Sequence, residues 1–251
     1  MFAAPESRAA LLGVYALVAE WRALIDPSTE MAVARLKLGW WQEEMQRLAA
    51  GRPVHPISVY LAGLKGAAAA DFSPLMQAVE AAEAHLQGAP LECGADLEAH
   101  SWPLWGEPLM QAARLAAPDF DAASVRGCGQ ALAAADYLSR AIDDYGREAR
   151  RGRVSFAVDE LLAAGIENAD LCAVDPPARL QDYLERSRRR TRDYFALAAR
   201  TLPAAQASAQ RHLLVLAALG AARMDRPKPA SERWRLQDML LSWSTARRAN
   251  R

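Results

Sequence analysis

Four charged residues recur at intervals of four in the middle of the chain: Asp136, Arg140, Asp144 and Glu148. In an α-helix this spacing places all four side chains on one face. Asp144 and Glu148 could then direct two carboxylates toward one Mg²⁺ ion, which prefers oxygen ligands and often bridges to substrate phosphates. The same spacing also produces solvent-exposed salt bridges on ordinary helices. Spacing alone therefore leaves both interpretations open.

Unusual segments flank this charged face on both sides. The segment Ala149-Arg-Arg-Gly-Arg153 places basic groups beside the paired carboxylates, which suits a diphosphate and its metal. An alternative interpretation of this segment is an ordinary helix end, in which Gly152 is the cap and the arginines interact with the helix dipole. Before the charged face, Gly127, Gly129 and the segment Ala131 to Ala135, in which only Leu132 is large, form a stretch of small residues. They permit close approach of a ligand or, as the simpler alternative, of a neighbouring helix.

The elements that must position these residues are helices. Apolar residues recur at helical spacing, no segment alternates with period two, and the prolines fall between the helical patterns. The patterns predict about nine helices and no sheet, hence one all-α domain over residues 1–251. The predicted helices begin and end near residues 5–25, 28–50, 55–70, 74–87, 109–117 (after an interruption at Pro103 to Pro108), 122–151, 177–200, 205–223 and 231–247.

Composition restricts the function classes. Apolar residues make up 52% of the 251 residues, and Lys plus Arg equal Asp plus Glu at 30 each. This zero net charge argues against a nucleic-acid binder. Three cysteines without metal-ligand spacing argue against a disulfide scaffold or a zinc ribbon. The longest apolar run, Leu213 to Ala222, is too short to cross a membrane, and the first residues lack a signal pattern, so we expect a cytoplasmic protein. The basic run Arg186 to Arg192 predicts a solvated helix face, or else a position near the cavity mouth or contact with an anionic membrane surface.

The segment from Gly129 to Arg153 resembles the second aspartate-rich region of the squalene/phytoene synthase family, with Asp144 and Glu148 at the two acidic positions. Shorter segments resemble other stretches of the same family in the same order. They are Pro5-Glu-Ser-Arg8, Val14-Tyr-Ala-Leu17, Leu36-x-x-x-Trp40-Trp-x-x-Glu44 and Pro53-x-His55-Pro56. The resemblance implies a helical bundle of the isoprenoid-synthase type with a central cavity. It also implies Mg²⁺-dependent, head-to-head condensation of isoprenyl diphosphates.

The resemblance also implies roles for individual residues. Catalysis and metal binding would fall to Asp26, Asp144 and Glu148. Substrate contacts would come from Tyr15, Arg22, Asp136, Arg140 and Arg153. We expect Arg22 and Asp26 to face Asp144 and Glu148 across a cavity lined by residues 1–26 and 122–151, with Asp136 and Arg140 one to two turns deeper.

The first aspartate motif departs from the family pattern. Its place reads Arg22-Ala-Leu-Ile-Asp26, so an arginine replaces the first aspartate, and Ala19 replaces an arginine that usually precedes the motif. A guanidinium at this position repels Mg²⁺. Arg22 could instead bind a phosphate directly or pair with Asp26. These changes predict weak Mg²⁺ binding and slow or absent catalysis.

A second hypothesis follows from this departure. The sequence is also similar to the divergent branch of the family that includes the mitochondrial complex I assembly factor, on the Pro-x-Ser-Arg start, Glu20 and Leu241-Ser-Trp243. That similarity implies a pseudoenzyme that uses the same fold as a binding or assembly scaffold, with a protein or a peripheral membrane as its partner.

Overall fold

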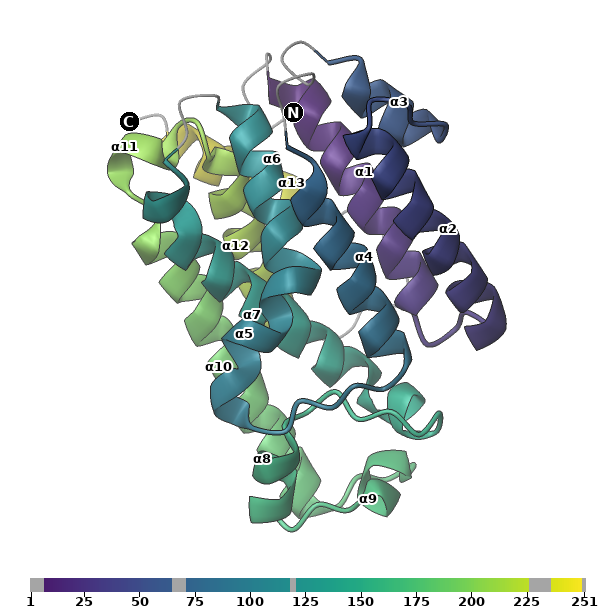
Figure 1. Cartoon of the computed structure of the whole chain (residues 1–251). Coiled ribbons are helices and arrows are strands. Elements are labelled where there is room, and N and C mark those ends of the chain that lie inside the picture. The colour runs from purple at the N-terminus through teal and green to yellow at the C-terminus, as the bar shows by residue number, and fades with distance from the viewer. Residues whose placement is uncertain (1–6, 65–70, 118–120, 226–235, 250–251) are drawn as a thin grey trace.

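The computed structural model describes residues 7–64, 71–117, 121–225 and 236–249, and within these ranges the regular structure is entirely helical. The all-α fold class is therefore confirmed for the described residues. The long helices lie side by side, and α8 and α9 lie together at one end of the molecule (Figure 1). The elements are α1 (Arg8–Ile25), α2 (Met31–Ala49), α3 (Pro56–Ala62), α4 (Ser73–Leu86), η3 (Gly94–Asp96), α5 (Leu97–Ser101), η4 (Trp102–Gly106), α6 (Glu107–Ala116), α7 (Ala122–Ala149), α8 (Val158–Ala163), α9 (Asn168–Cys172), α10 (Ala178–Thr201), α11 (Ala204–Ala207), α12 (Arg211–Met224) and α13 (Leu236–Arg248).

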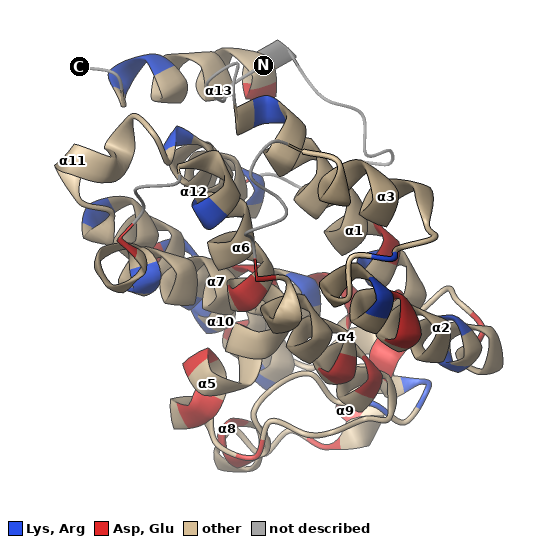
Figure 2. Cartoon of the chain, turned by 45° about the horizontal axis from the view of Figure 1, so that its top comes forward, with Lys and Arg blue, Asp and Glu red and all other residues tan. Residues whose placement is uncertain are grey.

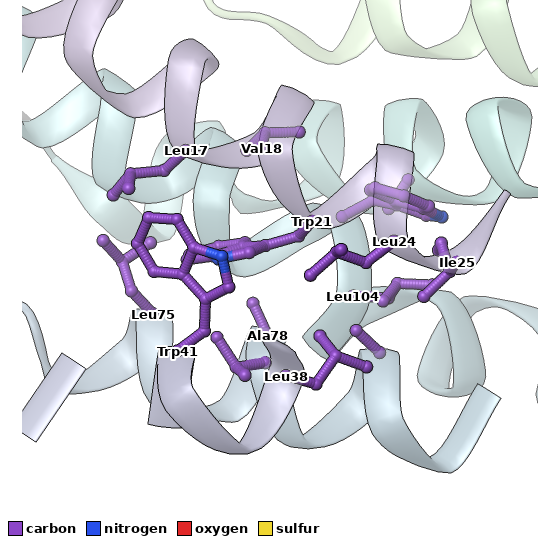
Figure 3. Close-up of a cluster of buried hydrophobic side chains, with 14 of the residues drawn as sticks. Leu17, Val18, Trp21, Leu24, Ile25, Leu38, Trp41, Leu75, Ala78 and Leu104 are labelled. Atoms are coloured by element: carbon purple, nitrogen blue, oxygen red, sulfur yellow. The ribbon is translucent and has the colours of Figure 1, made fainter. Parts of the chain in front are cut away.

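The apolar stripe of α1 forms one side of the largest core. Leu17 and Trp21 face Leu38 and Trp41 of α2, and Leu75 of α4 closes the cluster (Figure 3). The rings of Trp21 and Trp41 meet edge to face, with centroids 6.0 Å apart and planes at 86°. Burial of each such side chain stabilises the fold by about 1.5–3 kcal/mol. This packing fixes the orientation of α1, and with it the positions of the polar residues on its other face.

The helix α7 is shared by three hydrophobic cores. Its Ala133 packs into the core with α1, α2 and α4, whereas Ala131 packs into the core with α10 and α12, and Ile142 belongs to a third core near α8 and α9. Apart from Gly127, which is exposed, the small residues of α7 are thus buried against neighbouring helices, as the tight-packing interpretation predicts. Gly129 lies against Met110 of α6.

The segment from Pro103 to Pro108 is not an interruption, so that prediction is wrong. Residues 97–116 form one continuous helical segment in which η4 is a π-helical turn. The N–H of Glu107 donates to the carbonyl of Trp102, five residues earlier. This wider turn accommodates a proline, which lacks an N–H and would clash with the carbonyl four residues before it in a regular helix.

Other boundaries also differ from the predicted ones. The helix predicted over 205–223 is two helices, α11 and α12, and the short helices α5, α8 and α9 were not predicted. Trp243, which the sequence leaves as either a core residue or a partner contact, is 55% exposed and so is not a core residue. Trp234 and residues 65–70 of the third predicted helix lie outside the described residues. His55 caps α3, since its side chain accepts the N–H of Ile57.

Charged residues of both signs are spread over the helices rather than gathered in one field, as Figure 2 shows for one view. The basic run on α10 is partly neutralised, because Arg190 pairs with Glu160 at 2.6 Å and Arg192 pairs with Asp225 at 2.9 Å. None of the helices in the described part of the chain is long and apolar enough to cross a membrane.

Candidate functional site

A polar pocket opens where the C-terminal end of α1 approaches the C-terminal half of α7. It contains about 420 Å³ of empty space, part of it open to solvent. Its lining comprises Arg22, Ile25, Asp26, Pro27, His85, Leu104, Trp105, Tyr137, Arg140, Ala141, Asp144, Glu148 and Ser155. The structure therefore brings Arg22 and Asp26 to the same pocket as Asp144 and Glu148, as the sequence predicts. The catalytic and metal-binding roles of these residues remain predictions.

An apolar pocket adjoins the polar one. It contains about 830 Å³ of empty space and is lined by Tyr15, Val18, Arg22, Trp105, Pro108, Leu109, Leu132, Asp136, Phe195, Leu216, Leu219, Gly220 and Arg223. Arg22 and Trp105 line both pockets, so the two share a wall. At Gly220 an added Cβ would overlap the ring of Phe195. The absence of a side chain at Gly220 thus lets Phe195 lie against α12 as part of this pocket.

The shared wall is a cluster of charges against an indole ring. Arg22 Nη2 donates to Asp136 Oδ2 at 2.8 Å, and Arg140 Nε donates to the same oxygen at 3.1 Å. The guanidinium carbon of Arg22 lies 4.1 Å from the centroid of Trp105, and that of Arg140 lies 5.1 Å from it. The suggestion that Arg22 pairs with Asp26 is wrong, because Arg22 points across to α7.

Burial governs the electrostatics of this wall. Burial lowers the pKa of Arg22 to about 10, although Asp136 opposes the shift, so the guanidinium is charged at neutral pH. Burial alone would raise the pKa of Asp136, but the charges of Arg22 and Arg140 outweigh it and hold that pKa below its usual value. The wall therefore carries two cations and one anion in a partly desolvated place, where charge interactions are stronger than in water.

A single arginine joins the two aspartates at the mouth of the polar pocket. Arg147 pairs with Asp144 and also lies 3.8 Å from Asp26. Asp26 Oδ1 accepts the backbone N–H of Ser28 at 2.8 Å and its hydroxyl at 2.6 Å. Burial opposes the shift, but these hydrogen bonds and Arg147 keep the pKa of Asp26 low.

Glu148 is held by a buried ion pair with Arg153, and the two side chains are only 5% exposed. The turn after α7 creates this pair. Gly152 has φ +74°, which favours glycine, and the N–H of Arg153 donates to the carbonyl of Glu148 at 3.0 Å. The C-cap of α7 is Arg150, and Gly152 follows two residues later in the left-handed conformation; this reversal of the chain brings the Arg153 side chain back to α7.

The acidic residues of the two pockets do not fit a metal cluster. Asp136, Asp144 and Glu148 each bond an arginine, and Asp26 lies 3.8 Å from one. Among the described residues, no three histidine, cysteine or acidic side chains lie close enough together to hold a metal ion. A divalent cation would have to displace guanidinium groups from their carboxylates.

Several pocket residues carry no recognisable sequence signal. Trp105 lies in the segment read as an interruption, although it forms the wall between the pockets. His85 lines the polar pocket, and burial and then the charge of Arg153 lower its pKa to about 4. A lone tryptophan or histidine without a spaced partner has no pattern that would indicate this position.

Comparisons with known proteins match both the sequence and the fold. The family model of squalene/phytoene synthase matches residues 1–247. The chain is 25% identical over 195 residues to the chloroplastic phytoene synthase of Narcissus pseudonarcissus, and 24% identical over 195 residues to phytoene synthase 1 of Arabidopsis thaliana. Each alignment covers 76% of this chain and 46% of the relative. The chain thus spans about half the length of these curated relatives.

Solved structures show the same fold. A dehydrosqualene synthase in complex with a ligand superposes with a TM-score of 0.75 at 14% identity, over 99% of this chain and 89% of that one. The squalene synthase HpnC from Alicyclobacillus acidocaldarius superposes with a TM-score of 0.69 at 18% identity, over 89% of this chain and 84% of that one. The predicted isoprenoid-synthase type of helical bundle is confirmed.

Proposed function

Because the chain belongs to the squalene/phytoene synthase family, we propose that it binds an isoprenyl diphosphate across its two adjoining pockets. The diphosphate occupies the polar pocket, and the hydrocarbon chain occupies the apolar one. The observation that carries this proposal is the shared wall, where Arg22 and Trp105 line both pockets. A ligand with an anionic head and an apolar tail matches a polar space that continues into an apolar one.

We propose that guanidinium groups carry most of the head-group recognition. Arg22 and Arg140 line the polar pocket, and Arg147 lies beside it on α7. Arginine binds phosphate oxygens through two parallel hydrogen bonds. To bind a phosphate in this way, each arginine must leave the carboxylate with which it now pairs. Because Arg147 pairs with Asp144 and lies near Asp26, and Arg153 pairs with Glu148, we expect these three carboxylates to bind Mg²⁺ weakly and condensation to be slow or undetectable.

The alternative is a non-catalytic binding or assembly scaffold of the kind that the complex I assembly factor represents, with a protein or membrane partner. The observation that favours it is the set of ion pairs that occupies the acidic residues. Robust turnover of farnesyl or geranylgeranyl diphosphate by the unmodified chain would exclude this alternative.

Calorimetric titration of Mg²⁺ and a non-hydrolysable farnesyl diphosphate analogue tests the proposal on three proteins: the unmodified chain, Arg22→Asp and Arg22→Gln. Arg22→Asp removes a cation and adds an oxygen ligand beside Asp26, so we expect Mg²⁺ affinity to rise on the order of tenfold. Arg22→Gln removes the charge alone and serves as the control, with a smaller rise.

The head-group assignment predicts the opposite order for the analogue without Mg²⁺. Both variants lose a guanidinium, so both should bind it more weakly than the unmodified chain. An Arg22→Asp variant that binds Mg²⁺ no better would mean that Arg22 does not occupy the metal position. Analogue binding by the unmodified chain that is too weak to measure would contradict the proposed function itself.

A further inference from the structure

A second apolar hollow lies on the other side of α12 from the apolar pocket. It contains about 910 Å³ of empty space, part of it open to solvent, and α10, α11, α12 and α13 line it, mostly with alanine side chains. The proposed function assigns nothing to this second hollow. Its position raises the question of what separates it from the pocket that is proposed to hold the hydrocarbon tail.

The helix α12 forms most of the partition between the two spaces. Four of its residues line the apolar pocket: Leu216, Leu219, Gly220 and Arg223. Four others line the second hollow: Leu214, Ala217, Ala218 and Ala221. Each set has the spacing of one helix face, and the two sets are displaced by two residues. Because successive residues of a helix are rotated by about 100°, the two sets point in nearly opposite directions.

Beside α12, where α10 packs against it, the partition is a single ring. Of the described residues that line either space, only Phe195 of α10 lines both. Its side chain is 6% exposed, and its ring occupies the place that a Cβ at Gly220 would overlap. On the side of the second hollow, the neighbouring side chains of α10 are those of Ala196 and Ala199. These methyl groups are too short to close the gap that removal of the ring would leave.

Deepening the proposed function on which it rests, we propose that Phe195 is a specificity-determining residue, whose ring limits the length of the hydrocarbon tail that the site accepts. A tail that fills the apolar pocket gains no further apolar contact, because the ring closes the way between α10 and α12. Without the ring, a longer tail passes between these two helices into the second hollow. The alanine lining of that hollow then provides apolar surface for the additional carbon atoms.

Alkylphosphonates of increasing length, from octylphosphonate to octadecylphosphonate, test this inference. They are titrated by calorimetry into the unmodified chain, Phe195→Ala and Phe195→Leu. For the unmodified chain, we expect the affinity to rise about fourfold with each methylene group that becomes buried, and to stop rising once the tail fills the pocket. In Phe195→Ala the rise should continue over several further carbon atoms. Phe195→Leu opens a smaller gap and should extend the rise by fewer carbon atoms.

The matched control is Leu214→Ala. Leu214 lines the second hollow and not the apolar pocket, so its truncation enlarges the hollow without opening the partition. The length at which the affinity stops rising should therefore stay as it is in the unmodified chain. In every variant, binding of the shortest homologue that the unmodified chain binds reports that the pocket is intact. Phe195→Leu keeps most of the buried apolar volume, so it provides the test if Phe195→Ala does not fold.

The outcomes separate this inference from the proposed function. If the limiting length is the same in both Phe195 variants as in the unmodified chain, the inference is wrong and the proposed function stands. The same conclusion follows if the unmodified chain shows no limiting length, or if Leu214→Ala moves it as far as Phe195→Ala does. Loss of the shortest homologue in Phe195→Leu would show that the ring supports the pocket instead of dividing two spaces, which also overturns the inference. If the unmodified chain binds no alkylphosphonate, both the inference and the proposed function are contradicted.

Discussion

Arg22 determines what the acidic face of α7 can do, because it places a cation between Asp136 and the ring of Trp105. The same face continues with Asp144 and Glu148, each bonded to an arginine from a nearby turn of the chain. Carboxylates bound in this way are strong ion-pair partners and poor metal ligands at once. A ligand that enters the polar pocket therefore competes with existing pairs, and the arginines can change partner from carboxylate to phosphate.

Replacement of Glu148 by Gln tests the buried pair. The change leaves the guanidinium of Arg153 buried without a compensating charge, so the free energy of unfolding should fall by about 3–5 kcal/mol. Urea denaturation measures it. The control is Glu43→Gln, which removes a 69% exposed partner of Arg47 and should cost about 0–1 kcal/mol. Equal effects of the two substitutions would show that burial does not strengthen the Glu148–Arg153 pair.

Spacing in the sequence predicts part of this residue-level arrangement. The intervals of four on α7 place Asp136, Arg140, Asp144 and Glu148 beside the pockets, because a helix face follows from periodicity alone. The partners across helices follow from no such rule. Which arginine meets which carboxylate depends on how α1 packs on α7 and on where the chain reverses at Gly152.

At the scale of elements, the π-helical turn η4 is the feature that shapes the site. It joins α5 to α6 without a break and places Trp105 between the two pockets. Sequence reasoning treats two prolines within six residues as the end of a helix, since each normally breaks the hydrogen-bond ladder. Whether a π-helical turn forms around a proline depends on the surrounding packing, so the local sequence does not predict it.

Gly106 makes this turn compact, and Gly106→Ala tests its importance. An added Cβ there would overlap the ring of Trp102. We expect the unfolding free energy to fall by about 1–3 kcal/mol through overpacking, with weaker binding of the diphosphate analogue as Trp105 shifts. The control is Gly39→Ala on the exposed side of α2, where an added Cβ meets nothing within 4 Å. That substitution should raise stability by about 0.5–1 kcal/mol, and a Gly106→Ala variant that behaves like it would refute the packing argument.

At the scale of the whole molecule, α7 links three cores, so the walls of both pockets rest on the same helix. Composition and periodicity predict this helical architecture because Ala- and Leu-rich amphipathic segments have few other ways to bury their apolar faces. They do not predict that His212, a lone histidine on a mostly apolar helix, is buried, since nothing in its sequence neighbourhood distinguishes a core position from a surface position.

Buried neutral histidines make the stability of the whole chain depend on pH. The pKa of His212 falls to about 3 in the fold, against an ordinary value of 6.5, so the unfolded chain binds a proton that the folded chain does not. The free energy of unfolding should therefore decrease as pH falls from about 6.5 toward 4, by up to about 1.4 kcal/mol per pH unit for one such group. His85 contributes in the same direction.

Urea denaturation at pH values between 4 and 7.5 measures this dependence. His212→Gln removes the titrating group, so its stability should change less steeply with pH than that of the unmodified chain. An unchanged slope in the variant would mean that His212 is accessible to protons in the folded state.

The ion pairs around the two pockets also have a kinetic consequence. Five arginines and five acidic residues cancel here: Arg22, Arg140, Arg147, Arg153 and Arg223 against Asp26, Asp136, Asp143, Asp144 and Glu148. A group of ion pairs with zero net charge produces only a weak electrostatic potential in the surrounding solvent. Long-range attraction therefore does not speed the approach of an anion. The association rate of a diphosphate or phosphonate, followed by stopped-flow fluorescence, should therefore change little with ionic strength. The opening of salt bridges after the first encounter would then limit the rate of binding. A steep fall of the association rate with added salt would show that the charges around the pockets do not cancel.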